Sequence, residues 1–316
     1  MTALIDRLRA FIGASTGSHV AVDPVNLPMI RRWVEAMGDT NPVYVDDEAA
    51  RRSGRAALVA PPAMLPVWTM TGLRATIDAA GAAATPNRGV FVALAEAGFT
   101  LTPGVNLTHH YTRDLRVGDR LHAEGAVAAV SEEKQTALGP AHFVDLQSRY
   151  RDDDGELVGE QILRVIAYNT STERRTHSAT NEQSVSGPGA GDEQLPSLPI
   201  TIDRLGVIAC TTACNDFRAG HYDPDLARAI GMRDIFTDIP TSAGLAARYV
   251  TDWAGPRARL LELDVALGVA FCAGDTLTLT GSVGAPRLDG AVAIAVRGHT
   301  AHGRHLRASA VLDVLR

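Results

Sequence analysis

The sequence predicts an α+β protein made of two similar halves, each with one long helix followed by an antiparallel sheet. A repeated motif is the first sign. Residues 38–46 resemble residues 215–223, and the stretches that follow them, 48–54 and 225–231, are also alike. The order of the later elements is the second sign. In both halves an apolar, helix-like segment comes next, and runs of alternating apolar and polar residues follow it.

Length and composition are typical of a globular protein with two domains. The chain has 316 residues, of which 46% are hydrophobic and 21% charged, enough to build a substantial core. It has no uninterrupted apolar run of about eighteen residues, and its first residues lack the layout of a signal peptide. We therefore expect a cytoplasmic protein that does not enter membranes.

The charge and the cysteine content argue against several partners. The net charge is −6 and only 5% of residues are aromatic, so we expect no basic face for nucleic acid. The three cysteines show no CxxC spacing, which argues against structural disulfides and a zinc site. A few local arginines can still hold the phosphates of an anionic small molecule on an acidic protein.

A polar segment separates the halves. Between residues 171 and 194 there are almost no large apolar side chains, so nothing there can offset the entropy lost on ordering. We interpret this stretch as a mobile linker. The predicted domains are residues 1–170 and 198–316, joined by a flexible linker at 171–197.

Each half contains an apolar segment with a proline near its start, at residues 60–68 in the first half and 238–253 in the second. In the second segment Leu245, Tyr249 and Trp253 recur at every fourth position, which is the apolar stripe of a buried helix. A proline suits the first turn of that helix, and a Gly-Pro pair ends it.

Strand-like segments fill the remainder of each half. In both halves a Gly-Asp turn leads into alternating apolar and polar residues, the period of a half-buried antiparallel strand. The predicted strands lie at residues 115–127, 142–150 and 158–168 in the first half and at 273–283, 291–296 and 306–315 in the second.

The two copies of the motif differ at one informative position. Both keep an aspartate, Asp39 and Asp216, but only the second copy has an imidazole five positions later, because His221 stands where the first copy has Tyr44. A carboxylate and an imidazole on one turn can act as general base and acid. The alternative is a surface turn in which the aspartate caps a helix. We expect Asp39, which lacks the imidazole, only to cap or brace a turn.

These segments resemble the MaoC-like family of the hotdog superfamily, in which a curved antiparallel sheet wraps a long central helix. The second half is similar to (R)-specific enoyl-CoA hydratases, whose signature is an aspartate in a Gly-Asp-x-Asn-Pro-x-His pattern. The first half is similar to FAS1-type, or HadA-like, dehydratase amino-terminal domains through residues 38–42 and 60–62. Residues 231–236 and 249–256 look more specifically like actinobacterial hydratases of steroid side-chain enoyl-CoA thioesters.

The resemblance covers nearly the whole chain apart from the linker. It implies a double hotdog, with a degenerate first domain and a catalytic second one. Asp216 and His221 would grip one water, deprotonate it as it attacks C3 of a trans-2-enoyl thioester, and return a proton to C2. Amide donors at the start of the helix would stabilise the thioester oxygen. No metal or organic cofactor is implied.

The chain departs from the family pattern around the site. Arg218 and Ala219 replace the Asn-Pro that follows the aspartate. The glycine amide that the family uses at the helix start is replaced by that of Ile239. Gly244 stands where a serine often supports the catalytic aspartate, so Thr241 or Ser242 would substitute as an oxyanion or substrate contact.

Other polar residues have two interpretations each. Three arginines are candidates for binding coenzyme A phosphates, with solvated surface charge as the alternative. The histidines near the end of the chain suggest a metal site, but solvated residues of a strand-turn-strand are expected. Two cysteines at helical spacing should pack in a core. The arginines are Arg248, Arg257 and Arg259, the histidines are His299, His302 and His305, and the cysteines are Cys210 and Cys214.

The leading functional hypothesis is an enoyl-CoA hydratase, a hydro-lyase that runs reversibly as a dehydratase, acting on a bulky acyl-CoA such as a steroid side-chain thioester. One alternative is a 3-hydroxyacyl dehydratase for carrier-protein thioesters. Another is a non-catalytic acyl-CoA-binding subunit of a hotdog complex. The expected partners are the acyl-CoA substrate and a second copy of the chain, in a homodimer or a larger assembly.

Overall fold

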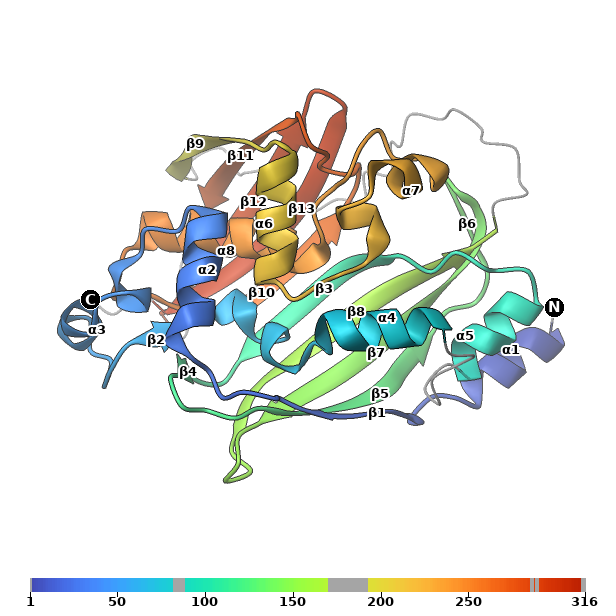
Figure 1. Cartoon of the computed structure of the whole chain (residues 1–316), viewed down its shortest axis with the longest axis horizontal. Coiled ribbons are helices and arrows are strands. Elements are labelled where there is room, and N and C mark those ends of the chain that lie inside the picture. The colour runs from blue at the N-terminus through green and yellow to red at the C-terminus, as the bar shows by residue number, and fades with distance from the viewer. Residues whose placement is uncertain (1, 82–88, 170–192, 285–286, 288–289, 314–316) are drawn as a thin grey trace.

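One antiparallel sheet runs through both halves of the molecule (Figure 1). The computed structural model describes residues 2–81, 89–169, 193–284, 287 and 290–313. Within these residues the sheet has eleven strands, ten of them in the order β1-β5-β7-β8-β3-β10-β13-β12-β11-β9, while β6 pairs with β7. A separate pair is formed by β2 and β4.

The first half holds sixteen of the described elements. The helices and turns are α1 (Thr2–Arg9), α2 (Leu27–Met37), η1 (Pro42–Tyr44), α3 (Asp47–Arg52), η2 (Pro62–Met64), η3 (Val67–Thr69), α4 (Gly72–Gly81) and α5 (Gly89–Glu96). The strands are β1 (Ser15–Val20), β2 (Val59–Ala60), β3 (Gly104–Tyr111), β4 (Leu115–Arg116), β5 (His122–Val130), β6 (Lys134–Thr136), β7 (Gly139–Arg151) and β8 (Leu157–Tyr168).

The second half repeats this plan with fewer elements. Its helices and turns are α6 (Arg204–Ala213), η5 (Ala219–His221), α7 (Pro224–Ala229) and α8 (Ile239–Ala254). Its strands are β9 (Glu193–Thr201), β10 (Arg259–Leu267), β11 (Thr276–Val283), β12 (Val292–Thr300) and β13 (Gly303–Asp313).

The two halves meet edge to edge at β3 and β10. These strands pair antiparallel, with Leu107 opposite Val265 and Thr108 opposite Asp264. The Thr108 hydroxyl donates to Asp264 Oδ2 at 2.7 Å, which adds a side-chain bond across the junction. Five strands lie on each side of this junction along the path, so the predicted α+β plan of two joined antiparallel sheets is confirmed.

The helix predicted in the second half is confirmed as α8, which packs against β10, β13 and β3. Ten of its sixteen residues are buried, including Leu245 and Tyr249 of the predicted stripe. Asp238 caps its first turn and Gly255 ends it at φ 80°. Within the described ranges, no helix is both long enough and apolar enough to cross a membrane.

The first half differs from the prediction because it has no single long central helix. The chain instead forms the short turns η2 and η3 and then α4. Pro66 lacks the N–H that a continuous helix requires, Met70 is extended (φ −65°, ψ 136°), and Gly72 takes a left-handed φ of 72°. The prolines that suggested a helix start therefore break the helix into pieces.

The predicted linker is only partly covered by the structure. Residues 193–197, assigned to the linker, belong to β9, which pairs with β11 at the edge of the sheet. Prolines at an edge strand are tolerated because its outer side needs no ladder bonds. The rest of the predicted linker, residues 171–192, and the end of the alanine-rich run at 79–84 lie outside the described residues.

The repeated motif extends further than the sequence comparison indicated. With a constant offset of 177 residues (216 − 39), α2 corresponds to α6, η1 to η5, and α3 to α7. The helix caps and the left-handed residues correspond in the same register. Asn26 and Asp203 are N-caps, Gly38 and Asn215 have φ of 61° and 60°, and Gly54 and Gly231 have φ of 86° and 87°.

The halves also interlock through helices and one buried arginine. In Figure 1, α2 and α6 lie side by side in front of α8. Arg55, which follows α3, donates to Pro256 O (2.6 Å) and Ala258 O (2.8 Å) beyond the end of α8 and pairs with Asp114. The first half thus anchors the chain just beyond the C-terminal end of α8.

Candidate functional site

Asp216 is held on a tight turn at the end of α6. The preceding residue, Asn215, adopts a left-handed conformation (φ 60°), which Asn tolerates better than most residues. The Asp216 amide donates to Thr211 O (2.9 Å), and its carboxylate accepts from the Arg218 amide (3.2 Å). The side chain is buried, with 6% of the residue exposed. The carboxylate is therefore fixed in direction and shielded from bulk water.

His221 ends the short turn η5 and faces Asp216. Its Nδ1 lies 2.7 Å from Phe236 O, and its ring meets the Phe236 ring edge-on with centroids 4.9 Å apart. Since a carbonyl oxygen only accepts, Nδ1 carries the hydrogen, and Nε2 of the neutral ring offers a lone pair. Nε2 lies 3.8 Å from Asp216 Oδ2. This exceeds a direct hydrogen bond, so both atoms can bind a third partner.

The first half braces this turn. Asn215 Nδ2 donates to Met70 O (3.1 Å), and Gly72 lies beside the Asn215 amide group, where an added Cβ would come within 3.4 Å. The break in the first-half helix turns the Met70 carbonyl away from an intrahelical partner and makes it available. The degenerate half therefore supports the turn that carries Asp216.

The N-terminus of α8 offers one backbone donor beside the pair. Asp238 Oδ1 accepts from the Thr241 amide (2.7 Å), Asp238 O accepts from the Ser242 amide (3.2 Å), and Pro240 has no N–H. No described hydrogen bond engages the remaining amide, that of Ile239. The Ile239 side chain packs against Gly104 of β3, which fixes this end of the helix against the first half.

The hydroxyls of Thr241 and Ser242 have other partners than Asp216. Thr241 Oγ1 lies 3.5 Å from Cys214 Sγ, and Ser242 Oγ lies 3.1 Å from Asp238 O and 3.0 Å from His305 Nε2. The described contacts include none from either hydroxyl to Asp216. Sequence reasoning missed Asp238, which lies next to the pair: burial, and then the charge of Asp216, raise the pKa of this carboxyl.

The equivalent turn in the first half holds no acid–base pair. Asp39 Oδ1 accepts from the Asn41 amide (2.9 Å), so it braces the turn as expected. Tyr44 is buried and takes the place of His221. Burial raises the pKa of Asp39 to about 6, with the nearby charge of Asp252 adding to the rise and that of Arg248 opposing it.

Replacing Asp39 with asparagine should stabilise the protein at neutral pH. The pKa of this carboxyl is 3.8 in the unfolded chain and about 6 in the fold. Below pH 4 it is mostly protonated in both states and does not lower the free energy of unfolding, whereas above pH 6 it ionises in the fold and lowers that free energy by the full amount. Asparagine retains the acceptor for Asn41. We expect Asp39→Asn to gain about 1–2 kcal/mol at pH 7.5, after discounting for partial exposure, and close to nothing at pH 4. Urea denaturation at both pH values measures this, and an equal gain at both would contradict it.

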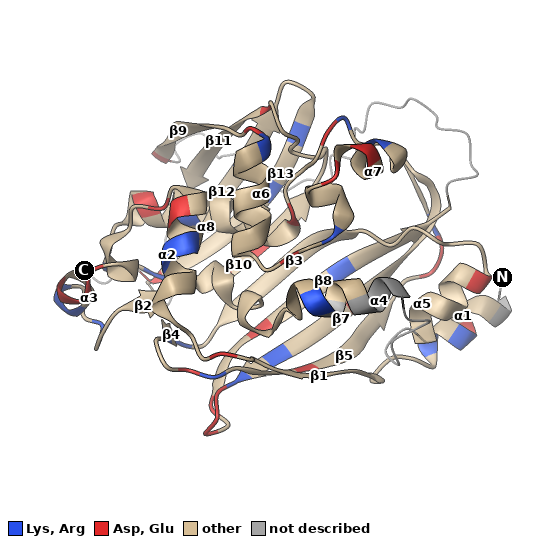
Figure 2. Ribbon diagram, in the orientation of Figure 1, with Lys and Arg blue, Asp and Glu red and all other residues tan. Residues whose placement is uncertain are grey.

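The three candidate arginines have different surroundings. Arg248 donates to Met37 O (2.7 Å) and pairs with Asp252, Arg259 pairs with Asp114, and Arg257 is exposed. Acidic and basic residues are mixed along the ribbon, as in α3, which carries both signs (Figure 2). The arrangement gives Arg248 and Arg259 structural roles at the junction of the halves.

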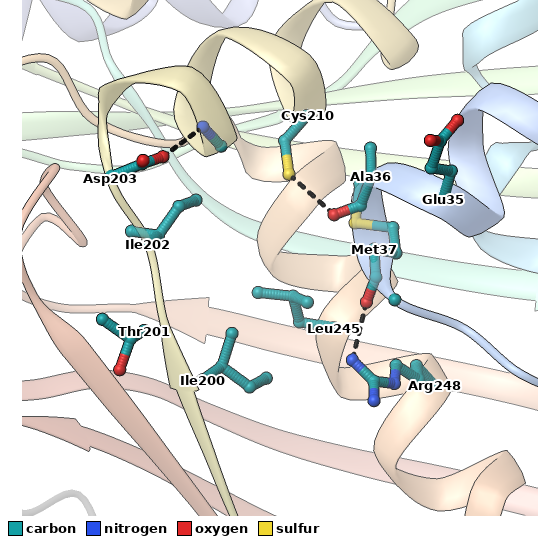
Figure 3. Close-up of a pocket in the computed structure, with 12 residues that line it drawn as sticks. Glu35, Ala36, Met37, Ile200, Thr201, Ile202, Asp203, Cys210, Leu245 and Arg248 are labelled. Atoms are coloured by element: carbon teal, nitrogen blue, oxygen red, sulfur yellow. Dashed lines mark hydrogen bonds between the residues drawn. The ribbon is translucent and has the colours of Figure 1, made fainter.

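A groove of about 470 Å³ lies at this junction (Figure 3). Arg248 reaches across it to Met37 O, and Cys210 Sγ donates to Ala36 O (3.4 Å). The acidic Glu35 and Asp203 also line the groove, which opposes phosphate binding. Neither Asp216 nor His221 lines it, so it is distinct from the acid–base pair.

The cysteines and the late histidines have structural positions. Cys210 and Cys214 are buried, as predicted, and burial raises the pKa of the Cys210 thiol to about 12. His305 is buried against Ser242, whereas His302 is half exposed and lies 3.6 Å from Asp275. Among the residues that the structure describes, no group of three or more His, Cys, Asp and Glu side chains could hold a metal ion.

Comparison with known proteins gives a family match and curated relatives. Residues 10–161 match the FAS1-like dehydratase domain region. A probable enoyl-CoA hydratase alpha subunit of Thermomonospora curvata is 41% identical over 243 residues, which cover 74% of this chain and 76% of that protein.

Two subunits of one Mycobacterium tuberculosis enzyme, 3-oxo-4,17-pregnadiene-20-carboxyl-CoA hydratase, are also similar. The alpha subunit is 39% identical over 153 residues, 48% of this chain and 47% of that protein. The beta subunit is 40% identical over 120 residues, 38% of this chain and 92% of that protein.

The fold has solved counterparts. A MaoC-like dehydratase superposes with a TM-score of 0.74 over 98% of this chain and 100% of that chain, at 14% sequence identity. A Mycobacterium tuberculosis protein described as having a double hotdog fold superposes with a TM-score of 0.60 over 95% of this chain and 96% of that chain, at 14% identity. This second likeness confirms the predicted double-hotdog fold, and the extent and identity of the Thermomonospora match establish the family. The chain belongs to the family of enoyl-CoA hydratase alpha subunits, and its fold is that of the double-hotdog proteins.

Proposed function

We propose that this protein is an enoyl-CoA hydratase that adds water reversibly across the double bond of a trans-2-enoyl-CoA thioester. The observation that carries the proposal is the buried pair of Asp216 and His221, whose facing atoms lie 3.8 Å apart, with Nδ1 of the imidazole held by the Phe236 carbonyl and Nε2 turned toward the carboxylate. The names of the curated relatives support the same reaction.

In this mechanism the pair binds one water between its two facing atoms. As the water oxygen forms a bond to C3, the pair removes a proton from it, and the double-bond electrons shift toward the thioester oxygen. A proton from the pair then reaches C2, which restores the resting state. The Ile239 amide at the positive end of α8 donates to the thioester oxygen while its negative charge develops. The proposed reaction needs no metal or organic cofactor.

We propose a bulky acyl group, such as a steroid side chain, as the substrate class. Two features support this choice. The mycobacterial relatives are named for a pregnadiene-carboxyl-CoA, and the first half replaces the central helix with short turns and α4. Arg257, the exposed arginine of the three, is the proposed contact for a coenzyme A phosphate.

We further propose a homodimer or larger assembly in the cytoplasm. The relatives are named as subunits, so members of this family assemble with partners. The free, buried cysteines suit a reducing compartment.

A dehydratase acting on carrier-protein thioesters is the second candidate, because the first half matches the FAS1-like dehydratase domain region. One assay separates the two. The purified chain is mixed with the same trans-2-enoyl group carried by coenzyme A or by an acyl carrier protein, over acyl groups from short chains to a steroid side chain. Loss of the ultraviolet absorbance of the conjugated thioester reports hydration, and product mass confirms the added water.

We expect the highest kcat/KM on coenzyme A thioesters with bulky acyl groups. Preference for the carrier-protein thioesters would support the second candidate. A strong preference for short chains would contradict the bulky substrate class. Absence of hydration with every thioester would leave a non-catalytic acyl-CoA-binding subunit and overturn the proposed enzyme.

A further inference from the structure

A third buried carboxyl lies next to the proposed acid–base pair. Asp238 precedes α8 directly and is only 3% exposed. Two residues before it, the carbonyl of Phe236 receives the hydrogen bond from His221. The same short segment thus orients the imidazole, supplies Asp238 and ends at the Ile239 amide.

One oxygen of this carboxyl has no partner. Oδ1 accepts from the Thr241 amide at 2.7 Å, whereas Oδ2 is buried and makes no hydrogen bond in the described structure. Buried polar atoms nearly always have a partner, because leaving one unpaired destabilises the fold. An orphan oxygen beside an active-site pair therefore points to a ligand that supplies the missing bond.

The surroundings favour the protonated form of Asp238. Burial raises its pKa first, the negative charge of Asp216 raises it further, and His221 opposes the rise. Two thiols lie close by, Cys210 in α6 and Cys214 just after it, and both have raised pKa values and supply no positive charge. The Cys214 thiol and the Thr241 hydroxyl also contact the Asp238 carboxyl. Ionising Asp238 beside the charge of Asp216 is costly, which favours a proton on Asp238, while the Arg218 side chain faces Asp216 at 3.7 Å (Nε to Oδ1).

We propose that Asp238 is a carboxylic acid whose Oδ2–H donates, together with the Ile239 amide, to the thioester oxygen of the bound substrate. The inference rests on the proposed hydratase reaction and adds a second donor to the oxyanion site. The proton stays on Asp238 throughout, and its hydrogen bond strengthens as the oxygen gains charge in the transition state. An apolar site can keep a carboxylic acid neutral at pH 7 for this purpose.

Three variants separate the donor role from the other roles of Asp238. Asparagine keeps the N-cap acceptor and presents an N–H where the acid presents O–H. Serine keeps a cap but lacks the second polar atom, and alanine lacks both. We expect Asp238→Asn to stay within about tenfold of the wild-type kcat, and Asp238→Ser and Asp238→Ala to lose about 100-fold in kcat with little change in KM.

The asparagine variant decides the outcome independently of helix stability. If Asp238→Asn loses as much rate as Asp216→Asn, the carboxyl acts as an acid or a base, and the donor proposal is overturned while the hydratase function stands. If Asp238→Ser retains the full rate, the second polar atom has no role and the proposal also fails. The proposed function itself fails only if the wild-type protein hydrates no enoyl thioester.

The protonation state can be observed directly. An infrared difference spectrum of wild type minus Asp238→Asn at neutral pH should contain the carbonyl band of a protonated carboxylic acid. Carboxylate bands alone would contradict the proposal, whatever the kinetic result.

Discussion

Replacement of His221 by glutamine should lower kcat for enoyl-CoA hydration about 1,000-fold without unfolding the protein. Glutamine can still donate an N–H toward the Phe236 carbonyl, so the turn retains its main contact. It has no basic nitrogen to replace Nε2, which lies 3.8 Å from Asp216 Oδ2, and it cannot take a proton from water. Initial rates with a saturating bulky enoyl-CoA measure the effect.

The matched control is His302→Gln, which changes a half-exposed histidine whose contact is Asp275. This variant should stay within about threefold of the wild-type rate. Asp216→Asn combined with His221→Gln should lose little more than His221→Gln alone, because groups that act as a unit are not additive. Additive losses in the double variant would contradict a shared water, and an active His221→Gln would remove the imidazole from the mechanism.

Gly244→Val should destabilise the protein by about 3 kcal/mol or more, since the added atoms have no space. A Cβ at this position of α8 would lie 2.7 Å from Trp33 Cζ2 and 3.3 Å from Met37 Sδ. Both partners belong to α2 and are buried, so neither can move into solvent. The denaturation midpoint in urea measures the loss.

The smaller substitution Gly244→Ala tests the same contact, through the sign of its effect on the free energy of unfolding. In an ordinary helix interior, Gly to Ala stabilises by about 0.5–1 kcal/mol. Here we expect it to destabilise, and we expect the loss to shrink in a Trp33→Leu background, where the clashing ring is removed. A stabilising Gly244→Ala in the wild-type background would contradict this packing. The contact also explains why glycine occupies the place where a serine was expected.

The second-half helix could be predicted because Leu245 and Tyr249 display the helical period and a Gly-Pro pair marks the end. The first-half helix could not be predicted correctly by the same reasoning. Pro66, Met70 and Gly72 interrupt it, and the local signal of an apolar segment with prolines does not distinguish a helix start from a series of short turns.

The site residues also differ in whether the local sequence or only the tertiary contacts reveal them. Asp216 and His221 were identifiable because the repeat supplied Asp39 and Tyr44 for comparison. Asp238 carried a visible signal as an N-cap residue, but its free oxygen depends on burial and on neighbours distant in sequence. The correspondence of α2 with α6 was also available from the offset of 177 residues, through the caps Asn26 and Asp203.

The central claim is that the duplicated motif carries one reacting site, in the second half. The most direct test is the hydration rate of two matched variants, Asp39→Asn and Asp216→Asn, since both aspartates accept a backbone amide two residues later. We predict that Asp216→Asn loses about 1,000-fold in kcat and that Asp39→Asn stays within about threefold of wild type. Similar losses in both variants, or a retained rate in Asp216→Asn, would contradict the account.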